Sequence, residues 1–358
     1  MSLTRRGRTT LGLFILLLLI AGGVGAVMAL GGAGTKGPSA GGNPSGGGSG
    51  GGPTTSPPPA ECPLSGLKPR TSVPIRPALA VKVENLPAAR PQTGLSWADI
   101  VYEEPVEGGI TRFIAIYQCQ NASRIEPVRS GRLTDVDVLV QFNHPLFAYA
   151  GGKPRVIQAI RRAGIIDINY NVREVVKAYH RDLNRQAPHN LYTSTKELYS
   201  AAKSLYQPEI PDPVFTYSET APAGAVKARS AHLPFSSSSD VFWKWSKTKK
   251  VWLRFHGTVP HVSSDGTQFS AKNVVVQLVT IKMTDLTDSN GAPSPKAITV
   301  GGGKAYVLRD GKVIKGTWVR DKASDITKFL DASGNEIPLA PGNTWVELLP
   351  KTIRVTIK

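Results

Sequence analysis

The sequence predicts an α/β (α+β) protein with two folded domains, preceded by a membrane segment and a flexible linker. Three observations support this. An apolar run follows a basic N-terminus, a stretch of Gly, Ser and Pro follows the run, and the remainder mixes strand and helix patterns before turning to strands alone. We expect a mixed α/β domain at 61–210 and a mostly antiparallel β domain at 225–358, each long enough to bury a core.

The first 30 residues have the pattern of a membrane anchor. Arg5, Arg6 and Arg8 precede an apolar run at 11–30, and about 20 apolar residues suffice for a helix to span a bilayer. Basic residues on its N-terminal side predict a cytoplasmic N-terminus and an extracytoplasmic body. Residues 1–30 are therefore predicted to be a cytoplasmic stub and a single-pass transmembrane helix. A cleaved signal peptide and a secreted body are the alternative.

Residues 31–60 consist mainly of Gly, Ser, Pro and Thr. Such a segment lacks the apolar side chains that build a core, so we expect it to be disordered. Its mean reach as a flexible coil is roughly 30 Å. The segment would thus act as a spacer between membrane and body.

The composition favours an anionic partner. Lys and Arg total 43 against 26 acidic residues. A basic body outside the cytoplasm suits acidic wall polymers or lipid head groups, and nucleic acid is not the expected partner. General solubility is the other explanation of the charge.

Cys62 and Cys119 are the two cysteines of the chain. In an exported protein a single disulfide is the natural expectation, with two free thiols as the alternative. A structural zinc site is not expected, because there are no paired Cys motifs.

The first folded domain alternates between strand and helix patterns. Strands are predicted at 79–85, 98–104, 111–118 and 147–150, and helices at 131–140, 155–163 and 195–205. The stretch 172–181 fits either a helix or an extended segment.

The second domain consists of strands separated by turn signals such as Asp310-Gly311. Strands are predicted at 240–245, 251–255, 274–283, 304–308, 312–320, 344–349 and 352–357. The Pro-rich stretch 208–222 marks the boundary between the domains.

Polar residues of the first domain gather in three loops beside predicted elements, where sites are usually built. The loops cover 103–112, 127–132 and 181–192. Their candidate ligand-binding residues are Glu103, Arg112, Arg129, Ser130, Arg132, Arg185, His189 and Asn190. The catalytic candidates are Glu107, Asp135 and His189, in which a carboxylate and an imidazole would share acid–base work.

Each of these assignments has a structural alternative. Arg129 and Arg132 flank Ser130 before a predicted helix, which favours binding of phosphate or carboxylate. Arg129 is equally compatible with an ion pair to Glu103 or Glu107, and Ser130 with a helix cap. A carboxylate cluster for a divalent metal lacks a specific ligand spacing, so no metal or cofactor is predicted.

Several motifs carry a family resemblance. They include "PLSGL" from Pro63, "EPVRSGR" from Glu126, "APHNLY" from Ala187, "DGKVIKGTWVR" from Asp310 and "PGNTWVELLP" from Pro341. With these motifs the chain resembles the YerB-like family of bacterial envelope proteins, a domain of unknown function (3048) with N- and C-terminal parts. The resemblance implies a two-domain α/β body, with a three-layer mixed α/β N-terminal domain, and an exported location. Many members are lipoproteins, whereas this chain has no anchoring cysteine at the end of its apolar run and is expected to use a transmembrane helix instead.

The leading hypothesis is an envelope-anchored protein that binds an anionic wall or lipid-derived ligand through an Arg-rich cleft. One alternative is a hydrolase of wall glycan or a phosphodiester. The other is a structural or protein-docking module, in which Arg and Glu side chains pair with each other and leave no open cleft. Whether the protein is an enzyme is left open by the sequence.

Overall fold

The computed structural model describes residues 60–358, which belong to one compact unit. The expected membrane helix and most of the expected linker lie outside the described residues. Within residues 60–358, no helix is long and apolar enough to cross a membrane. The disulfide between Cys62 and Cys119 is confirmed.

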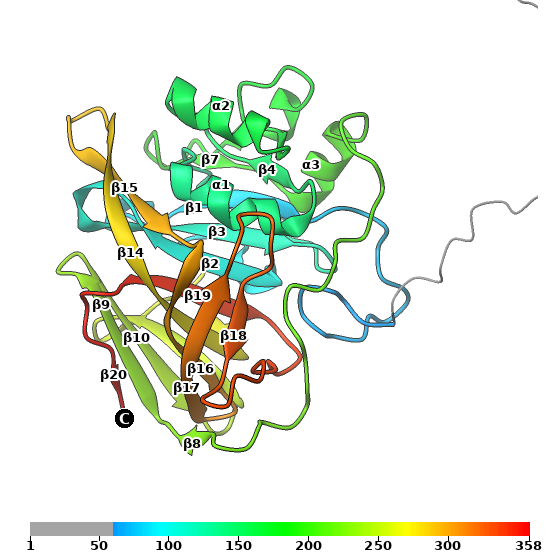
Figure 1. Cartoon of the computed structure of the whole chain (residues 1–358). Helices are drawn as coiled ribbons and strands as arrows, with labels where there is room; N and C mark the ends of the chain where they lie inside the picture. The colour runs from blue at the N-terminus through cyan, green and yellow to red at the C-terminus, as the bar shows by residue number, and fades with distance from the viewer. Residues whose placement is uncertain (1–59) are drawn as a thin grey trace, which may run out of the picture. The chain divides into compact units, whose positions relative to one another are not determined.

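A 12-stranded mixed sheet forms the centre of the unit (Figure 1). Its order is β18-β17-β16-β14-β19-β2-β3-β1-β4-β5, with β15 on β14 and β8 on β17. The strands are β1 (Leu79–Glu84), β2 (Ile100–Pro105), β3 (Thr111–Tyr117), β4 (Leu146–Ala148), β5 (Ile166–Asp167), β8 (Val226–Lys227), β14 (Asn273–Thr287), β15 (Pro293–Ile298), β16 (Gly301–Arg309), β17 (Lys312–Arg320), β18 (Lys328–Leu330) and β19 (Thr344–Pro350).

A second, six-stranded sheet comes entirely from the C-terminal part, and a small ribbon comes from the N-terminal part. The second sheet contains β9 (Ser230–Ser236), β10 (Ser239–Ser246), β11 (Val251–His256), β12 (Val259–Pro260), β13 (Ser270–Ala271) and β20 (Thr356–Ile357). The ribbon pairs β6 (His180–Arg181) with β7 (Leu191–Tyr192).

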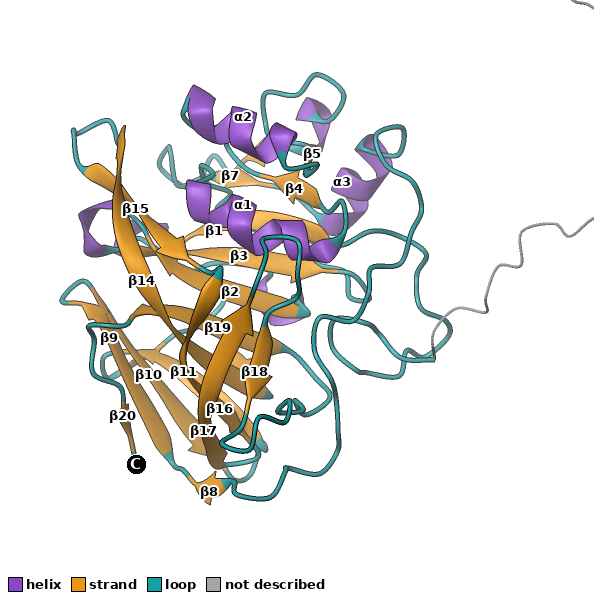
Figure 2. Cartoon of the chain, viewed as in Figure 1, coloured by secondary structure: helices purple, strands orange, loops and turns teal. Residues whose placement is uncertain are grey.

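The helices α1 (Leu133–Leu139), α2 (Pro154–Arg162) and α3 (Thr195–Ala201) all belong to the N-terminal part, as Figure 2 shows. The α/β class is thereby confirmed, with strands dominating the C-terminal part. Short 3-10 turns lie at Pro87–Ala89, Leu95–Trp97, Glu107–Gly109, Val140–Phe142 and Val176–Ala178. The undecided stretch 172–181 thus forms one such turn followed by β6.

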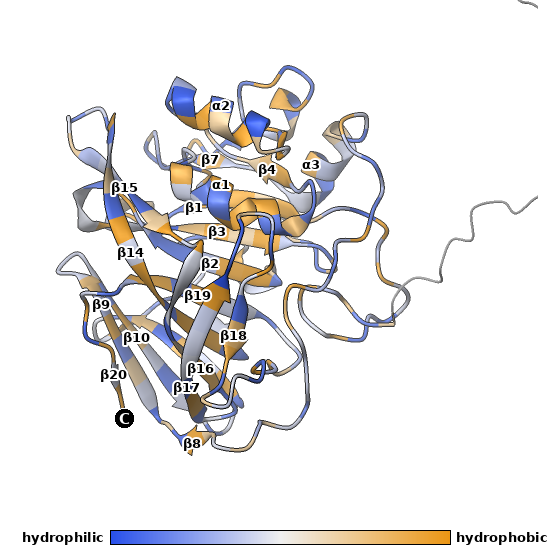
Figure 3. Cartoon of the chain, in the orientation of Figure 1, coloured by the Kyte–Doolittle hydropathy of each residue, from blue (hydrophilic) through white to orange (hydrophobic). Residues whose placement is uncertain are grey.

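Alternate side chains of β1 point to opposite faces of the long sheet, and each face packs against a different hydrophobic core. Leu79, Val81 and Val83 face one core together with α3 and the second sheet. Ala80 faces the other core, against α1 and α2. Successive strand residues point to opposite faces, so a strand buried on both sides is apolar nearly throughout. Figure 3 shows hydrophobic residues concentrated along these central strands.

The charged residues of β1 interrupt this apolar pattern on one face only. Lys82 and Glu84 follow Ala80 at intervals of two, so they point toward the α1 and α2 side. Both are fully buried or nearly so. The face of β1 that packs against α1 and α2 is therefore apolar at Ala80 and charged at Lys82 and Glu84. The candidate site lies at this charged end of the strand.

The expected domain boundary falls in 202–225, which contains neither helix nor strand. The long sheet nevertheless continues across both parts, because β19 pairs in parallel with β2, aligning Glu347 with Glu103. Two strands that are far apart in sequence thus become neighbours. The division into two domains stays a prediction at this level.

Candidate functional site

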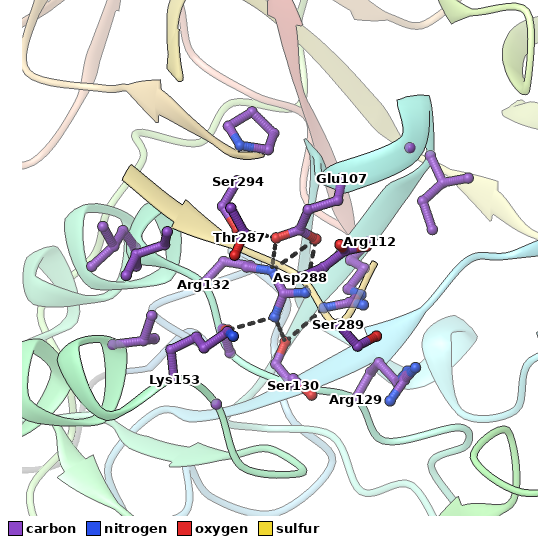
Figure 4. A pocket seen from close by; sticks show the side chains of 18 of the residues that line it. Glu107, Arg112, Arg129, Ser130, Arg132, Lys153, Thr287, Asp288, Ser289 and Ser294 are labelled. Carbon is purple, nitrogen blue, oxygen red and sulfur yellow. Dashed lines mark hydrogen bonds and ion pairs between the residues drawn. The ribbon is translucent and has the colours of Figure 1, made fainter. Parts of the chain in front are cut away.

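A pocket of about 580 Å³ opens where β1 ends and β3 begins, between the 127–132 loop, the start of α2 and the β14–β15 hairpin. We call it the arginine pocket. Figure 4 shows Arg112, Arg129, Arg132 and Lys153 around this hollow, with Glu107 and Ser294 on its other side. Its charged lining residues are Glu84, Glu107, Arg112, Arg129, Arg132, Lys153 and Asp288. Cationic groups therefore outnumber the acidic ones.

Arg112, at the start of β3, is the most unusual of these residues. It is only 6% exposed. Nη1 donates a hydrogen bond to the Ser130 carbonyl at 3.1 Å, while Nε is buried without a partner. Within residues 60–358, no carboxylate forms an ion pair with it. Burial, and then the charges of Arg132 and Arg129, lower the Arg112 pKa to about 10.

Arg132 is held by Glu107. Nε lies 2.7 Å from Oε1 of this carboxylate, and Nη2 lies 2.8 Å from Oε2, which is a bidentate geometry. Ser294 of β15 donates a further hydrogen bond to Glu107. Burial alone would raise the Glu107 pKa, but Arg132 and Ser294 outweigh it and lower the pKa to about 2. Glu107 is therefore a fixed carboxylate and a poor proton acceptor.

Glu84 links Arg129 to His189. Nε of Arg129 donates to Oε1 of Glu84 at 2.8 Å, and Nδ1 of His189 lies 2.7 Å from Oε2. Glu84 is 1% exposed, and the side chain of His189 is 17% exposed. A carboxylate bound at Nδ1 favours the tautomer that leaves Nε2 as an acceptor. The ion pair considered for Arg129 is thus formed, but with Glu84 in place of Glu103 or Glu107.

The N-terminus of α1 can contribute little to binding an anion, contrary to the expectation from the sequence. α1 begins at Leu133 and has 7 residues, fewer than predicted. Its first turn is capped internally, because Asp135 accepts a hydrogen bond from the backbone N–H of Arg132 at 2.6 Å. Ser130 is not the cap residue, and its hydroxyl donates weakly to the Ala150 carbonyl at 3.4 Å. Anion attraction at this loop therefore comes from guanidinium groups.

Five of the predicted site residues do not line the arginine pocket: Glu103, Asp135, Arg185, His189 and Asn190. Glu103 is fully buried and binds Arg254 at 2.5 Å between the two sheets. Asn190 is 6% exposed and holds its own loop through Arg181 at 2.8 Å. Arg185 lines a neighbouring pocket instead. The structure thus gathers Glu107, Arg112, Arg129, Ser130 and Arg132, and connects His189 to them through Glu84.

Asp135 has a supporting position below the pocket. It is fully buried, and Oδ1 accepts a hydrogen bond from Nζ of Lys82 at 2.6 Å. Lys82 also pairs with Glu104. Burial, opposed by Lys82 and reinforced by Asp135, raises the Glu104 pKa to about 7. His189 has Glu84 as its carboxylate partner, in place of the Glu107 or Asp135 suggested by the sequence.

Sequence reasoning missed Glu84, Lys153 and the β14–β15 hairpin. The signal for Glu84 was present, since Lys82 and Glu84 are charges at alternate positions of an otherwise apolar strand. Nothing local indicated that Ser294 would reach Glu107, 187 residues away in sequence. In the part of the chain that the structure describes, no group of His, Cys, Asp or Glu side chains has the arrangement of a metal site.

The arrangement is suited to holding an anion. Arg112 offers a buried guanidinium without an acidic partner. Arg129 binds Glu84 through Nε, so its two Nη groups can donate to a ligand. Lys153 adds a flexible ammonium at the start of α2. An oxyanion in the pocket would form charge-assisted hydrogen bonds, which are roughly twice as strong as neutral ones.

Comparisons with known proteins agree with the fold and the sequence motifs. Two family models match the chain: "Protein of unknown function (DUF3048) N-terminal domain" at residues 64–207, and "Protein of unknown function (DUF3048) C-terminal domain" at residues 231–346. The gap between the two models, residues 208–230, covers most of the irregular stretch 202–225 together with β8 and the first residue of β9.

A relative from Bacillus subtilis (strain 168), named "Putative lipoprotein YerB", is 30% identical over 300 residues. The match covers 81% of this chain and 86% of the relative. The crystal structure of the YerB protein from Bacillus subtilis superposes with a TM-score of 0.71 at 25% identity, over 83% of this chain and 99% of that one. The chain therefore belongs to the YerB-like family, whose two parts are described as protein of unknown function (DUF3048).

Proposed function

We propose that this protein is an extracytoplasmic envelope protein that binds a phosphate-bearing ligand in the arginine pocket. The apolar run at 11–30 would hold it at the membrane, and residues 31–60 would let the body reach ligands near the surface. The relative's name describes a lipoprotein, which supports a membrane-anchored location. The anchor differs in kind, because the cysteines of this chain are Cys62 and Cys119, beyond the apolar run.

The observation that carries the proposal is the buried guanidinium of Arg112. A charge that is taken from water without an acidic partner destabilises the fold. Arg129 and Arg132 lie near enough to lower the Arg112 pKa further, and Glu107 and Glu84 oppose this lowering only in part, so the pocket keeps positive charge at Arg112. A bound anion would offset this repulsion. A docking module with fully paired Arg and Glu side chains is less well supported, because Arg112 has no acidic partner and an open pocket is present.

Phosphate fits this pocket better than carboxylate. Donors approach from Arg112 on β3, from Arg129 on the 127–132 loop and from Lys153 at the start of α2. A carboxylate has two oxygens in one plane, whereas a phosphate presents oxygens in a tetrahedral arrangement and can meet donors from several directions. Arg forks match phosphate geometry well.

The proposal is tested by titration calorimetry of the full chain, purified in a nonionic detergent, with poly(glycerol phosphate) at low and moderate salt. We expect binding that weakens with salt and falls at least tenfold in the R112Q variant. K328Q, which removes an exposed charge on β18, is the matched control and should bind like wild type. Absence of binding by wild type at both salt concentrations would remove the proposal.

A second candidate, hydrolysis of a phosphodiester, is favoured by the Glu84–His189 pair. Nε2 of His189 would take a proton from water as the water oxygen bonds to phosphorus and the ester P–O bond breaks. With bis(p-nitrophenyl) phosphate the leaving group departs as p-nitrophenolate, which is measured by colour. Release that disappears in H189Q would support this activity, and no release by wild type would eliminate it.

A further inference from the structure

A second basic pocket, of about 680 Å³, lies beside the arginine pocket. We call it the Arg90 pocket. Its charged lining residues are Arg90, Arg124, Glu126, Asp182, Arg185 and His189. None of them belongs to the lining of the arginine pocket. Arg185 and His189 were candidate site residues in the sequence, whereas Arg90 was not.

The acidic residues of the Arg90 pocket are already paired. Arg124 lies 2.9 Å from Glu126 and 2.5 Å from Asp182. Arg185 lies 3.5 Å from Glu126 and also donates to the carbonyls of Pro91 and Ala89. The positive charges of Arg124 and Arg185 thus balance the negative charges of Glu126 and Asp182. The positive charge of Arg90 is not balanced by either carboxylate.

Arg90 is attached to the protein by neutral acceptors. Nε donates to the Asn85 side-chain oxygen at 3.2 Å, and Nη2 donates to the Asn85 carbonyl at 2.9 Å. Among residues 60–358 it has no ion pair with a carboxylate. Burial, followed by the charge of Arg254, lowers its pKa to about 10. Arg90 therefore resembles Arg112 in one respect: it is half-buried where Arg112 is buried, but each guanidinium is fixed by uncharged groups at the wall of a pocket.

A thin partition separates the two pockets. Glu84 lines the arginine pocket and His189 lines the Arg90 pocket, and their side chains are hydrogen-bonded at 2.7 Å. Along the chain, Leu86 lines the first pocket and immediately precedes the short turn Pro87–Ala89, while Ala88 lies within this turn and lines the second pocket. A ligand that leaves one pocket therefore needs to cross only this turn and the Glu84–His189 pair to enter the other.

We infer that the Arg90 pocket is a second anion subsite and that the ligand is a polymer with repeated phosphate groups, which lies across both pockets. This inference rests on the proposed function of the arginine pocket. One phosphate group binds at Arg112, and another group of the same chain binds at Arg90. The uncharged part of the polymer, between two phosphate groups, crosses the partition between the pockets.

Two subsites have a quantitative consequence. Once one phosphate is bound, the next is present at an effective concentration in the millimolar range, so a linked ligand binds about 10²–10⁴-fold more tightly than a single unit. A polymer should gain from both pockets, while a compound with one phosphate occupies the arginine pocket alone. The dependence of affinity on ligand length therefore distinguishes two subsites from one.

The test measures dissociation constants of the full chain in nonionic detergent at one fixed salt concentration. The probes are glycerol 1-phosphate, free poly(glycerol phosphate) of about ten repeats, and vesicles containing phosphatidylglycerol. We expect the polymer to bind wild type at least about a hundredfold more tightly than glycerol 1-phosphate, because ten repeats that bind singly at one subsite would gain only about tenfold. R90Q should lose this advantage while it binds glycerol 1-phosphate as wild type does, which also shows that the variant is folded. K328Q serves as the charge-loss control.

The outcomes separate the two proposals. If R112Q abolishes binding of glycerol 1-phosphate but R90Q binds the polymer as tightly as wild type, the second subsite is refuted and the proposed function stands. If wild type binds neither glycerol 1-phosphate nor polymer, the proposed function fails as well. If wild type binds the vesicles but not the free polymer, and R90Q does not bind the vesicles, the ligand of the Arg90 pocket is a lipid surface. This result would contradict the proposal that a polymer binds there.

Discussion

Nη1 of Arg112 donates to the Ser130 carbonyl at 3.1 Å, and this carbonyl is the acceptor that the described chain provides for the guanidinium. The main chain at Ser130 thus positions Arg112 but does not neutralise it. Arg132 has a bidentate carboxylate in the same pocket. This difference between two neighbouring arginines leads to the first prediction.

Replacing Arg112 by methionine should stabilise the protein while it removes ligand binding. The change exchanges a buried charge without an acidic partner for an apolar side chain, which removes the cost of taking that charge out of water. R132M is the matched comparison, and should lower the free energy of unfolding by about 3 kcal/mol because Glu107 loses its partner. Both values come from chemical denaturation without ligand. Equal destabilisation by the two variants would show that Arg112 is a structural residue.

Removing Lys82 should be strongly destabilising. Lys82 is fully buried between Glu104 and Asp135, so K82M leaves two acidic groups facing each other without a cation. Breaking a buried ion pair by removing one partner lowers the free energy of unfolding by about 3–5 kcal/mol. Denaturant titration of K82M and of the exposed-site variant K328M measures this. A change as small as that of K328M would contradict the buried triad.

The pH dependence of stability should contain a contribution from Asp99. Burial raises the Asp99 pKa to about 6 from a usual 3.8, despite hydrogen bonds from the N–H groups of Gln118 and Cys119. Between these values the folded protein binds more protons than the unfolded chain, so this group's contribution to the free energy of unfolding falls as pH rises from about 4 to about 7. A shift of two pKa units corresponds to roughly 3 kcal/mol.

D99N cannot ionise, and should therefore lack this contribution. The difference in free energy of unfolding between D99N and wild type should move in favour of D99N as pH rises from 4 to 7, and stay level above 7. Denaturation curves at a series of pH values give the difference directly. A constant difference across this range would mean that Asp99 titrates alike in both states.

The disulfide should contribute a large part of the stability. Cys62 and Cys119 are 57 residues apart, and closing a loop of that size restricts the unfolded chain by about 4 kcal/mol in the loop-entropy model. The C62S/C119S variant should unfold at a lower denaturant concentration, and reduced wild type should match it. Unchanged midpoints in both cases would rule out this contribution.

The sequence predicted much of the fold because most central strands carry clear local patterns. β1, β2, β3 and β17 lie close to the predicted ranges. The strands β9, β15 and β18 were missed, and β15 contains Pro293 and Pro295, which argue against a strand locally. β15 forms through its pairing with β14, where Met283 aligns with Pro295. That pairing is tertiary information, which local propensity does not contain.

The candidate site was predictable in part for a similar reason. Arg112, Arg129 and Arg132 stand in loops beside predicted strand ends, so their meeting could be anticipated. Glu103 looked equivalent, but it lies in β2 opposite Glu347 of β19 and points into the space between the sheets. Its direction depends on a strand 244 residues later in the chain. Arg90 was overlooked because one arginine in an irregular segment carries no pattern.

The central claim is that a phosphate group binds at Arg112, and a crystal structure of the protein with glycerol 1-phosphate tests it most directly. We expect an ordered phosphate in the arginine pocket with oxygens about 2.7–2.9 Å from the Arg112 guanidinium. A pocket that stays without phosphate at saturating glycerol 1-phosphate, or a phosphate bound only outside it, would contradict the account.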